Sequence, residues 1–402
     1  MTHHPAAQSR ATNDALSRAA EAPNTHPREN AADISAPQSN APDGAKRSDS
    51  AAPPNVSTLA SGRQRTSQIK SRGLTSEIHP TLLQEVMWLR ALSMLNRFRV
   101  IRAVDVALAC CPERPFKAAL TAAQRAMRGM AKTGLVRRYR TDRFQHVYGL
   151  TTAGARWLQD RGAEGSPSVR RVADMSNPEH RLWMSFIVLA CEARGLRALT
   201  ESEVLQELNR PIGKKRKPKQ GLTTVEHSSG KHVLRPDAIA FENDGATWFE
   251  IDRSKRGADR EESLSLLVGR IGLVLEKSET LRRVVVLART DRILLRAQAV
   301  LRAKALTANS EVLVPGRGRH FREIEPGIWE VWAAVWPSGG GDAIDVCVGH
   351  VVTQLLPTWL PKVRLDASNK QPLSGWLDEN YLPYRRPTTA KPWRQPVSPL
   401  RL

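Results

Sequence analysis

Three carboxylate residues have the spacing of a site that could bind a metal ion. A strand is predicted over residues 247–253, and its period-two alternation puts Glu250 and Asp252 on one face. Their side chains would leave the strand about 6–7 Å apart. Asp237 lies on a second predicted strand, residues 232–242, which an Asn-Asp-Gly turn joins to the first as a hairpin. The hairpin would therefore bring all three carboxylates to one point.

Converging carboxylates suggest phosphodiester chemistry. Their mutual repulsion is relieved only by protons or by a cation. A hard divalent ion, Mg²⁺ or Mn²⁺, suits oxygen ligands, polarises a phosphate and activates water. A second interpretation stays open, in which Asp237 is a turn residue and Glu250 and Asp252 form an exposed strand face paired with Arg253 or Lys255.

The elements around these residues alternate in type. A helix is predicted over 259–278, a buried strand over 283–289 and a further helix over 291–306. Residues 327–336 suit a strand pair or a short helix, and residues 344–356 a strand that passes into a helix. Two helices precede the hairpin, over 180–195 and 200–209. Thr200 and Glu203 have capping-box spacing at the start of the second, and the alternative for Glu203 is a fourth metal ligand. His180 is expected to be a packed or surface histidine.

The region before this one has a different order of elements. Helices are predicted over 82–95, 100–110 and 116–133, then strands over 135–140 and 146–150, then a helix capped by Thr151 or Thr152. In the third helix Leu120, Ala123, Met127 and Met130 share one face, and Gly134 suits its C-terminal end. This is the order of a winged helix-turn-helix.

Basic residues gather on the third helix, on the wing and in a later loop. A helix fits the major groove of DNA and a basic hairpin can reach the neighbouring backbone. The expected DNA contacts are Arg125, Arg128 and Lys132 on the helix, Arg137, Arg138, Arg140 and Arg143 on the wing, and Lys214, Lys215, Arg216 and Lys217 in the loop. The alternatives are a winged helix that contacts protein and, for the loop, a flexible tether.

Two short motifs resemble known folds. A Gly-Leu-Val, a charged hairpin and a Y-x-L-T-x-x-G pattern ending at Gly154 are similar to bacterial winged-helix domains over residues 80–162. Pro236-Asp237 followed by Glu250-Ile251-Asp252 resembles the restriction-endonuclease-like, PD-(D/E)xK, fold. That fold usually has Lys where Asp252 stands, so Lys255 or Arg253 would supply the catalytic cation.

The combination of both motifs resembles a narrower class. A winged helix followed by Arg-Pro-Asp-Ala and Phe-Glu-Ile-Asp is similar to the replication–relaxation family of mobile-element proteins and to mobilisation-C plasmid relaxases, over about residues 80–305. Those relaxases are related to restriction enzymes and depend on acidic residues and a metal. The resemblance implies that Asp237, Glu250 and Asp252 bind Mg²⁺ or Mn²⁺ and that Lys255 assists catalysis.

Composition favours a nucleic-acid partner. The 402 residues include 61 Lys plus Arg against 40 Asp plus Glu, a formal charge of +21, which attracts polyanions. No apolar run approaches the ~20 residues of a membrane span, and no signal peptide is recognisable, so we expect a cytoplasmic protein without membrane insertion. The four cysteines form no Cys-x-x-Cys pair and indicate neither a zinc site nor a disulfide.

We therefore expect an α/β (α+β) protein in four parts. These are a disordered basic tail over 1–75, a winged helix over 76–162, a restriction-endonuclease-like α/β domain over 177–356 and a Pro/Arg-rich extension over 357–402. In the extension Tyr384 and Trp393 stand among Arg385, Arg386, Lys391 and Arg394. This segment could bind single-stranded DNA by stacking or pack on the domain surface.

Two functions from different classes remain open. The first is a metal-dependent enzyme that nicks double-stranded DNA at an origin. The second is a non-enzymatic regulator of transcription or replication, in which the nuclease-like domain serves for homodimer formation or for contacts with relaxosome-type proteins. ATP-driven action is not indicated because no Walker motif occurs. A relaxase with a Tyr nucleophile is set aside because the His-apolar-His metal motif is missing.

Overall fold

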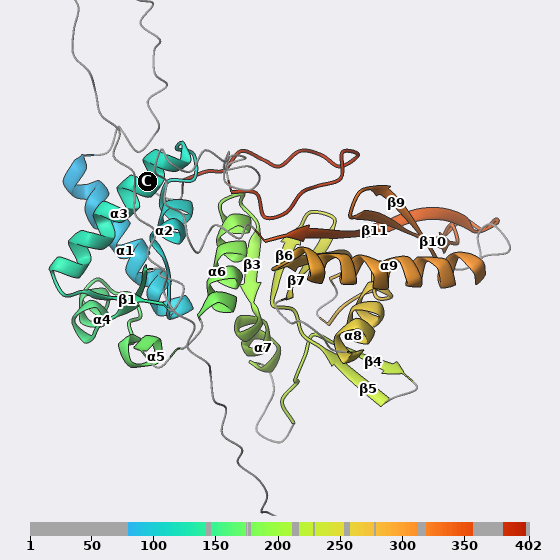
Figure 1. Cartoon of the computed structure of the whole chain (residues 1–402), viewed down its shortest axis with the longest axis horizontal. Coiled ribbons are helices and arrows are strands. Elements are labelled where there is room, and N and C mark those ends of the chain that lie inside the picture. Colours follow the sequence, from blue (N-terminus) through green and yellow to red (C-terminus); the bar gives the residue numbers. More distant parts are fainter. Residues whose placement is uncertain are drawn as a thin grey trace, which may run out of the picture. The chain divides into compact units, whose positions relative to one another are not determined.

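The computed structural model describes residues 79–141, 146–173, 175, 178–210, 217–227, 230–252, 258–276, 279–311, 319–356 and 381–398. Within these residues the protein is a mixed α/β structure, as the sequence predicts, and its strands form three separate β-sheets (Figure 1). None of the described helices is both long and apolar enough to cross a membrane.

The first part is helical with one small hairpin. Its elements are α1 (Pro80–Phe98), α2 (Ala103–Cys110), α3 (Phe116–Lys132), β1 (Val136–Arg140), β2 (His146–Leu150), α4 (Thr152–Gln159) and α5 (Val169–Ala173). Strands β1 and β2 pair antiparallel. The side chain of Thr151 caps α4 by accepting a hydrogen bond from the backbone N–H of Gly154 at 3.0 Å.

Helix α3 buries the face that its spacing predicts. Leu120, Ala123, Met127 and Met130 are buried against the other helices. Gly134 follows the helix with a φ of +74°, a conformation in which other residues are strained. This turn lets Leu135 donate back to the carbonyl of Met130 at 2.9 Å and directs the chain into β1.

The second part contains a seven-stranded sheet. Its strand order among the described residues is β3-β6-β7-β8-β11-β10-β9, with β7, β8 and β11 parallel and the other pairs antiparallel. The strands are β3 (Arg197–Thr200), β6 (Ala238–Glu242), β7 (Gly245–Asp252), β8 (Leu281–Ala288), β9 (Arg319–Glu325), β10 (Ile328–Val335) and β11 (Ile344–Leu355). The helices are α6 (Glu179–Glu192), α7 (Glu201–Asn209), α8 (Ala258–Val268) and α9 (Asp291–Glu311).

Some predicted elements differ from the observed ones. The strand expected over 232–242 is divided into β5 (Gly230–Leu234), which pairs with β4 (Thr223–His227), and β6 in the large sheet. Pro236 lies at the break, because it has no N–H to donate to a ladder. The helix expected to reach residue 278 ends at Val268, directly before Gly269. Residues 344–355 are strand throughout, because β11 pairs with β8 on one side and β10 on the other.

Two apolar cores cover the two faces of the sheet. Trp248 and Val286 face α8 and α9, and their core includes Leu267 and Leu301 from those helices. On the other face, Phe249 and Val285 belong to a core that includes α6 and also α1, α2 and α3. The helical first part and one face of the sheet therefore share a continuous apolar core.

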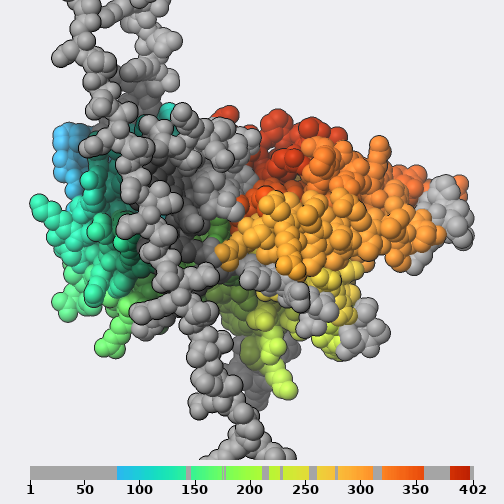
Figure 2. Space-filling model, viewed as in Figure 1, coloured from blue at the N-terminus to red at the C-terminus, as the bar shows by residue number. Residues whose placement is uncertain are grey.

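The C-terminal segment packs on the protein. Tyr381 and Tyr384 are almost completely buried, and the Tyr384 hydroxyl donates to Glu242 on β6 at 2.8 Å. Trp393 packs edge-on against the Tyr384 ring. In the space-filling view this segment lies against the surface formed by the last strands (Figure 2). Of the two interpretations of the extension, residues 381–398 therefore follow the one in which the segment packs on the domain surface. The buried Tyr384 ring is unavailable for stacking on DNA bases.

Candidate functional site

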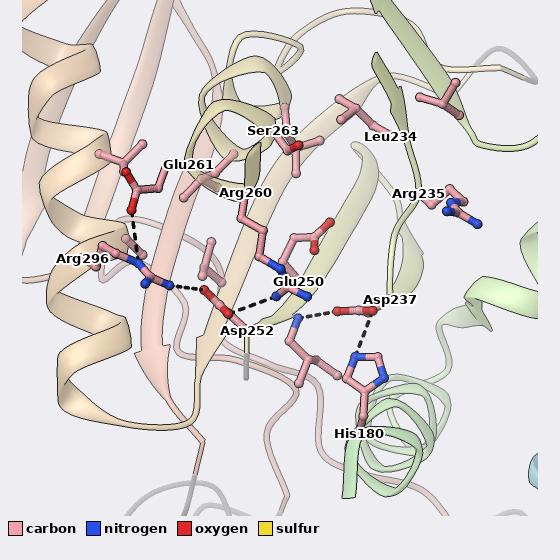
Figure 3. Close-up of a pocket in the computed structure, with 17 residues that line it drawn as sticks. His180, Leu234, Arg235, Asp237, Glu250, Asp252, Arg260, Glu261, Ser263 and Arg296 are labelled. Atoms are coloured by element: carbon pink, nitrogen blue, oxygen red, sulfur yellow. Dashed lines mark hydrogen bonds and ion pairs between the residues drawn. The ribbon is translucent and has the colours of Figure 1, made fainter. Parts of the chain in front are cut away.

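Strand β7 directs Glu250 and Asp252 into one cavity. The two side chains share a face with Trp248, which packs under α8 and α9, while Ile251 packs in the core on the other face. The cavity has a volume of about 560 Å³ and lies between the ends of β6 and β7 and the helices α6, α8 and α9 (Figure 3). Asp237 reaches the same cavity from the residue just before β6. The three predicted carboxylates thus line one cavity, although their oxygen atoms do not all lie within 4.8 Å of one another.

Asp237 is held by backbone and side-chain hydrogen bonds. Its N–H donates to the carbonyl of Phe249 at 3.1 Å, which continues the β6–β7 ladder by one residue. Its Oδ2 accepts from the backbone N–H of Ile251 at 2.6 Å, and its Oδ1 lies 3.0 Å from Nε2 of His180 on α6. The carboxylate is therefore fixed between a strand and a helix.

Glu250 lies in the most electrostatically unfavourable position. Its Oε1 accepts a hydrogen bond from Nε1 of Trp248 at 2.6 Å. Burial raises the pKa of Glu250 to about 8, and the negative charges of Asp237 and Asp252 add to the rise. The Trp248 hydrogen bond and the nearby Arg260 guanidinium lower this pKa without cancelling the rise.

Asp252 differs from its neighbours because guanidinium groups surround it. Its Oδ1 lies 3.1 Å from Nη1 of Arg260 on α8, and its Oδ2 lies 3.5 Å from Nη2 of Arg296 on α9. Arg296 also contacts Glu261 at 3.4 Å. The partners expected from sequence, Arg253 and Lys255, lie outside the described residues, and the partners that the structure describes come from the helices α8 and α9.

The donor set suits a divalent cation at Asp237 and Glu250. Both line the same cavity, and the pKa of Glu250 is raised first by burial and then by the charge of Asp237, both of which a bound cation would offset. Asp252 is the weaker candidate ligand, because Arg260 and Arg296 already compensate its charge. Asp237 and Glu250, with Asp252 as the weaker third ligand, are the residues that could hold Mg²⁺ or Mn²⁺.

Other predicted site residues have definite places. Glu203 forms the capping box of α7, with Oε2 accepting from the N–H of Thr200 at 2.8 Å, and its Oε1 lies 2.5 Å from Nε of Arg97. It is a capping residue and not a lining residue of the cavity. Lys255, Arg143, Lys214, Lys215 and Arg216 lie outside the described residues.

The described members of the predicted DNA-binding set are all exposed. They lie on two adjoining elements and one loop, and comprise Arg125, Arg128, Lys132, Arg137, Arg138, Arg140 and Lys217. The apolar face of α3 is buried, so its basic residues point outward by helical geometry.

Sequence reasoning missed three residues of the cavity. His180 was expected to be a packed or surface histidine, and Arg260 and Arg296 were given no role, yet all three side chains contact the carboxylates. No local pattern marks them. They come from three separate helices, and only the packing of α6, α8 and α9 around β7 brings them to one place.

The fold and the cavity together define a mixed α/β protein with an acidic site bordered by cations. A sequence model of the replication-relaxation family matches residues 88–265, from within α1 to within α8. This match confirms, over residues 88–265, the resemblance to the replication-relaxation family. The match includes Asp237, Glu250, Asp252 and Arg260, whereas Arg296 lies beyond it. It points to a role in replication or mobilisation of a plasmid or mobile element and to interaction with nucleic acid.

No curated protein and no solved structure matches the chain.

Proposed function

We propose that the protein nicks double-stranded DNA at an origin of a plasmid or mobile element, using a divalent metal ion. The observation that carries this proposal is that Asp237, Glu250 and Asp252 line one cavity at the ends of two paired strands. The raised pKa of Glu250 supports it, because a cation would stabilise a carboxylate whose charged form is disfavoured by burial and by the charge of Asp237. The family match agrees with an action on replicating or mobilised DNA.

In this proposal the first part of the chain is a winged helix that binds the DNA. Helix α3 would lie in the major groove and the β1–β2 hairpin would contact the neighbouring backbone. The exposed basic residues of these two elements support the assignment, since phosphate contacts from Arg and Lys supply most of the sequence-independent affinity. This part would hold the nuclease-like part near its target.

The second part would act as a restriction-endonuclease-like domain. A bound Mg²⁺ or Mn²⁺ would polarise the scissile phosphate and activate water. Asp237 and Glu250 would hold that ion. Arg260, whose side chain is 59% exposed, can orient a phosphate oxygen from the edge of the cavity. The related fold usually has a Lys at the position of Asp252. In this protein Arg260 would supply that positive charge.

The proposal is tested by relaxation of a supercoiled plasmid that carries the native origin, with Mg²⁺ or Mn²⁺ against EDTA. We expect metal-dependent conversion to open circle by the wild type. The Glu250→Gln variant should lose this activity by at least about 10²-fold, because it lacks the ionised ligand, while its binding to duplex DNA stays near wild type. Glu226→Gln, at an exposed position of strand β4, is a matched control that should nick normally. Full nicking by Glu250→Gln would overturn the site assignment.

A regulator without enzymatic activity is the second candidate. The observation that favours it is the pairing of Asp252 with Arg260 and Arg296 and of Asp237 with His180, which balances part of the negative charge without a metal. In that case the wild type would bind origin DNA tightly and leave it supercoiled in every metal. Asp237→Asn would then bind DNA and repress a reporter as well as the wild type.

A further inference from the structure

A cluster of side chains that could hold a metal ion lies on the opposite face of the large sheet from the carboxylate cavity. It comprises Glu330 on β10 and Cys347 and His350 on β11. Val352, two residues after His350, packs in the core that includes α6. Trp248, two residues before Glu250, packs in the core of α8 and α9 instead. Because alternate residues of a strand share a face, the cluster and the carboxylate cavity are on different sides of the sheet.

A β-bulge brings the cluster together. The register pairs Trp332 with Cys347 and Val331 with Gly349, which leaves Val348 as an extra residue on β11. Trp332 and Glu330 share a face of β10, so their partners Cys347 and His350 share a face of β11 although they are three residues apart. Without the bulge, the thiol and the imidazole would point to opposite faces. Bulges commonly re-aim side chains at functional positions.

The three side chains converge at ligand-binding distances. One ligand atom from each of Glu330, Cys347 and His350 lies within 4.8 Å of the other two. Nε1 of Trp332 donates to Oε2 of Glu330 at 3.0 Å, which orients the carboxylate as outer-shell hydrogen bonds do at metal sites. The Cys347 thiol faces the carbonyl of Gly349 at 3.5 Å. All three residues are half-buried, so an ion and a water molecule can reach them.

The surrounding charge is compatible with a cation. Arg283 on β8 is the register partner of His350. It forms ion pairs with Asp244 and with Glu242, the latter at 3.6 Å, so anions balance its charge. The added cation would meet two negative charges, from Glu330 and the ionised Cys347, beside the guanidinium groups of Arg282 and Arg283.

We propose that Glu330, Cys347 and His350 bind a Zn²⁺ ion. A thiolate, an imidazole and a carboxylate are the ligands that zinc takes in proteins, and the sulfur disfavours the hard ions Mg²⁺ and Mn²⁺. Three protein ligands leave a fourth, tetrahedral position for water or an external ligand. Binding forms a Zn–S bond, breaks the S–H bond of Cys347 and releases that proton to solvent. The proposal is independent of DNA nicking.

Cobalt titration of the full-length protein, purified free of metal, tests this site. Co²⁺ takes the place of zinc and gives a near-ultraviolet thiolate-to-metal band that carboxylate ligands do not produce. We expect this band to saturate at one equivalent of Co²⁺ and to be abolished by one equivalent of Zn²⁺. Zn²⁺ should also raise the melting temperature of the wild type. Absence of the band at saturating Co²⁺ would overturn the proposal.

Variants assign the band to the cluster. Cys347→Ser and His350→Ala should lose it or weaken zinc binding at least 10-fold, while keeping the melting temperature of the metal-free wild type. Asp237→Asn, in the other cavity, should keep it, which separates this site from the proposed nicking site. A band of full intensity in Cys347→Ser would place the metal at another cysteine and would equally overturn the assignment.

Discussion

Glu250 is the carboxylate of the cavity whose charged form is most disfavoured. Burial is the largest cause of its raised pKa, and the nearby Asp237 is the next. Asp237 has a backbone N–H and an imidazole as partners, and Asp252 has two guanidinium groups. The three carboxylates are therefore chemically distinct despite their similar spacing, and Glu250 is the one that most needs a cation.

The stability of the metal-free protein should depend on pH through Glu250. Its pKa rises from 4.5 to about 8, so the folded state holds the proton more tightly than the unfolded state does. Below pH 4.5 both states are protonated and there is no penalty. As the pH rises towards 8 the folded state loses stability, by on the order of a few kcal/mol. We expect Glu250→Gln to be more stable than the wild type at pH 8 in EDTA and nearly equal near pH 4.5.

Thermal melting of both proteins across this range, with EDTA, measures the effect. The Glu226→Gln control should follow the wild type at every pH, because Glu226 is exposed. A stability difference between wild type and Glu250→Gln that does not change with pH would contradict the raised pKa.

At the scale of elements, α3 and the β1–β2 hairpin form one basic surface. Met127 and Met130 bury one side of α3, which leaves Arg125 and Arg128 on the exposed side. Gly134 makes the tight turn between the helix and the hairpin. The same local sequence thus fixes which side of the helix faces outward and how closely the hairpin follows it.

Replacement of Arg125 and Arg128 by Ala should weaken binding to duplex DNA with little effect on stability. The slope of log K against log salt is negative, and each phosphate contact that is lost reduces its magnitude by about 1. The slope of the double variant should therefore be smaller in magnitude by about 2. Binding isotherms at several salt concentrations measure the slope. A control that replaces Arg302 and Arg322, exposed on α9 and β9, should keep the wild-type slope. An unchanged slope in the α3 variant would remove this helix from the proposed DNA interface.

At the scale of the whole molecule, side chains that are distant in sequence join the helical part to the sheet. Arg97 of α1 contacts Glu192 of α6 at 2.6 Å and Glu203 of α7 at 2.5 Å. Near the C-terminus, Ser398 donates to the carbonyl of Cys110 at 2.7 Å, and Val397 donates to the carbonyl of Ala193 at 2.9 Å. The final segment therefore contacts both the first helices and the elements beside the sheet.

Tyr384 should contribute to global stability. Its ring is fully buried against Phe249 and Trp393, so Tyr384→Ala should lower the free energy of unfolding by about 3–5 kcal/mol. Tyr384→Phe removes only the hydrogen bond to Glu242 and should cost about 1–3 kcal/mol. Urea denaturation measures both, with the half-exposed Val397→Ala as a near-neutral control. Wild-type stability of Tyr384→Ala would mean that the segment does not pack in solution.

The local sequence was sufficient to predict much of the secondary structure. The spacing of Leu120, Ala123, Met127 and Met130 identified the buried face of α3, and the pair Thr151 and Thr152 indicated where α4 begins, with Thr151 as the observed cap. Alternation along β7 correctly separated Glu250 and Asp252 from Phe249 and Ile251. These features depend on contacts within a few residues, and therefore a single sequence contains them.

The partners of the carboxylates and the meeting of Glu330, Cys347 and His350 were decided only by the tertiary structure. His180, Arg260 and Arg296 reach the cavity because three helices pack around one strand end, and no spacing in the sequence encodes that meeting. The bulge at Val348 reverses the face that alternation assigns, so Cys347 and His350 meet only once β10 and β11 pair. Local propensity specifies which face of an element is apolar, whereas strand register and helix packing depend on the whole chain and determine which polar groups meet.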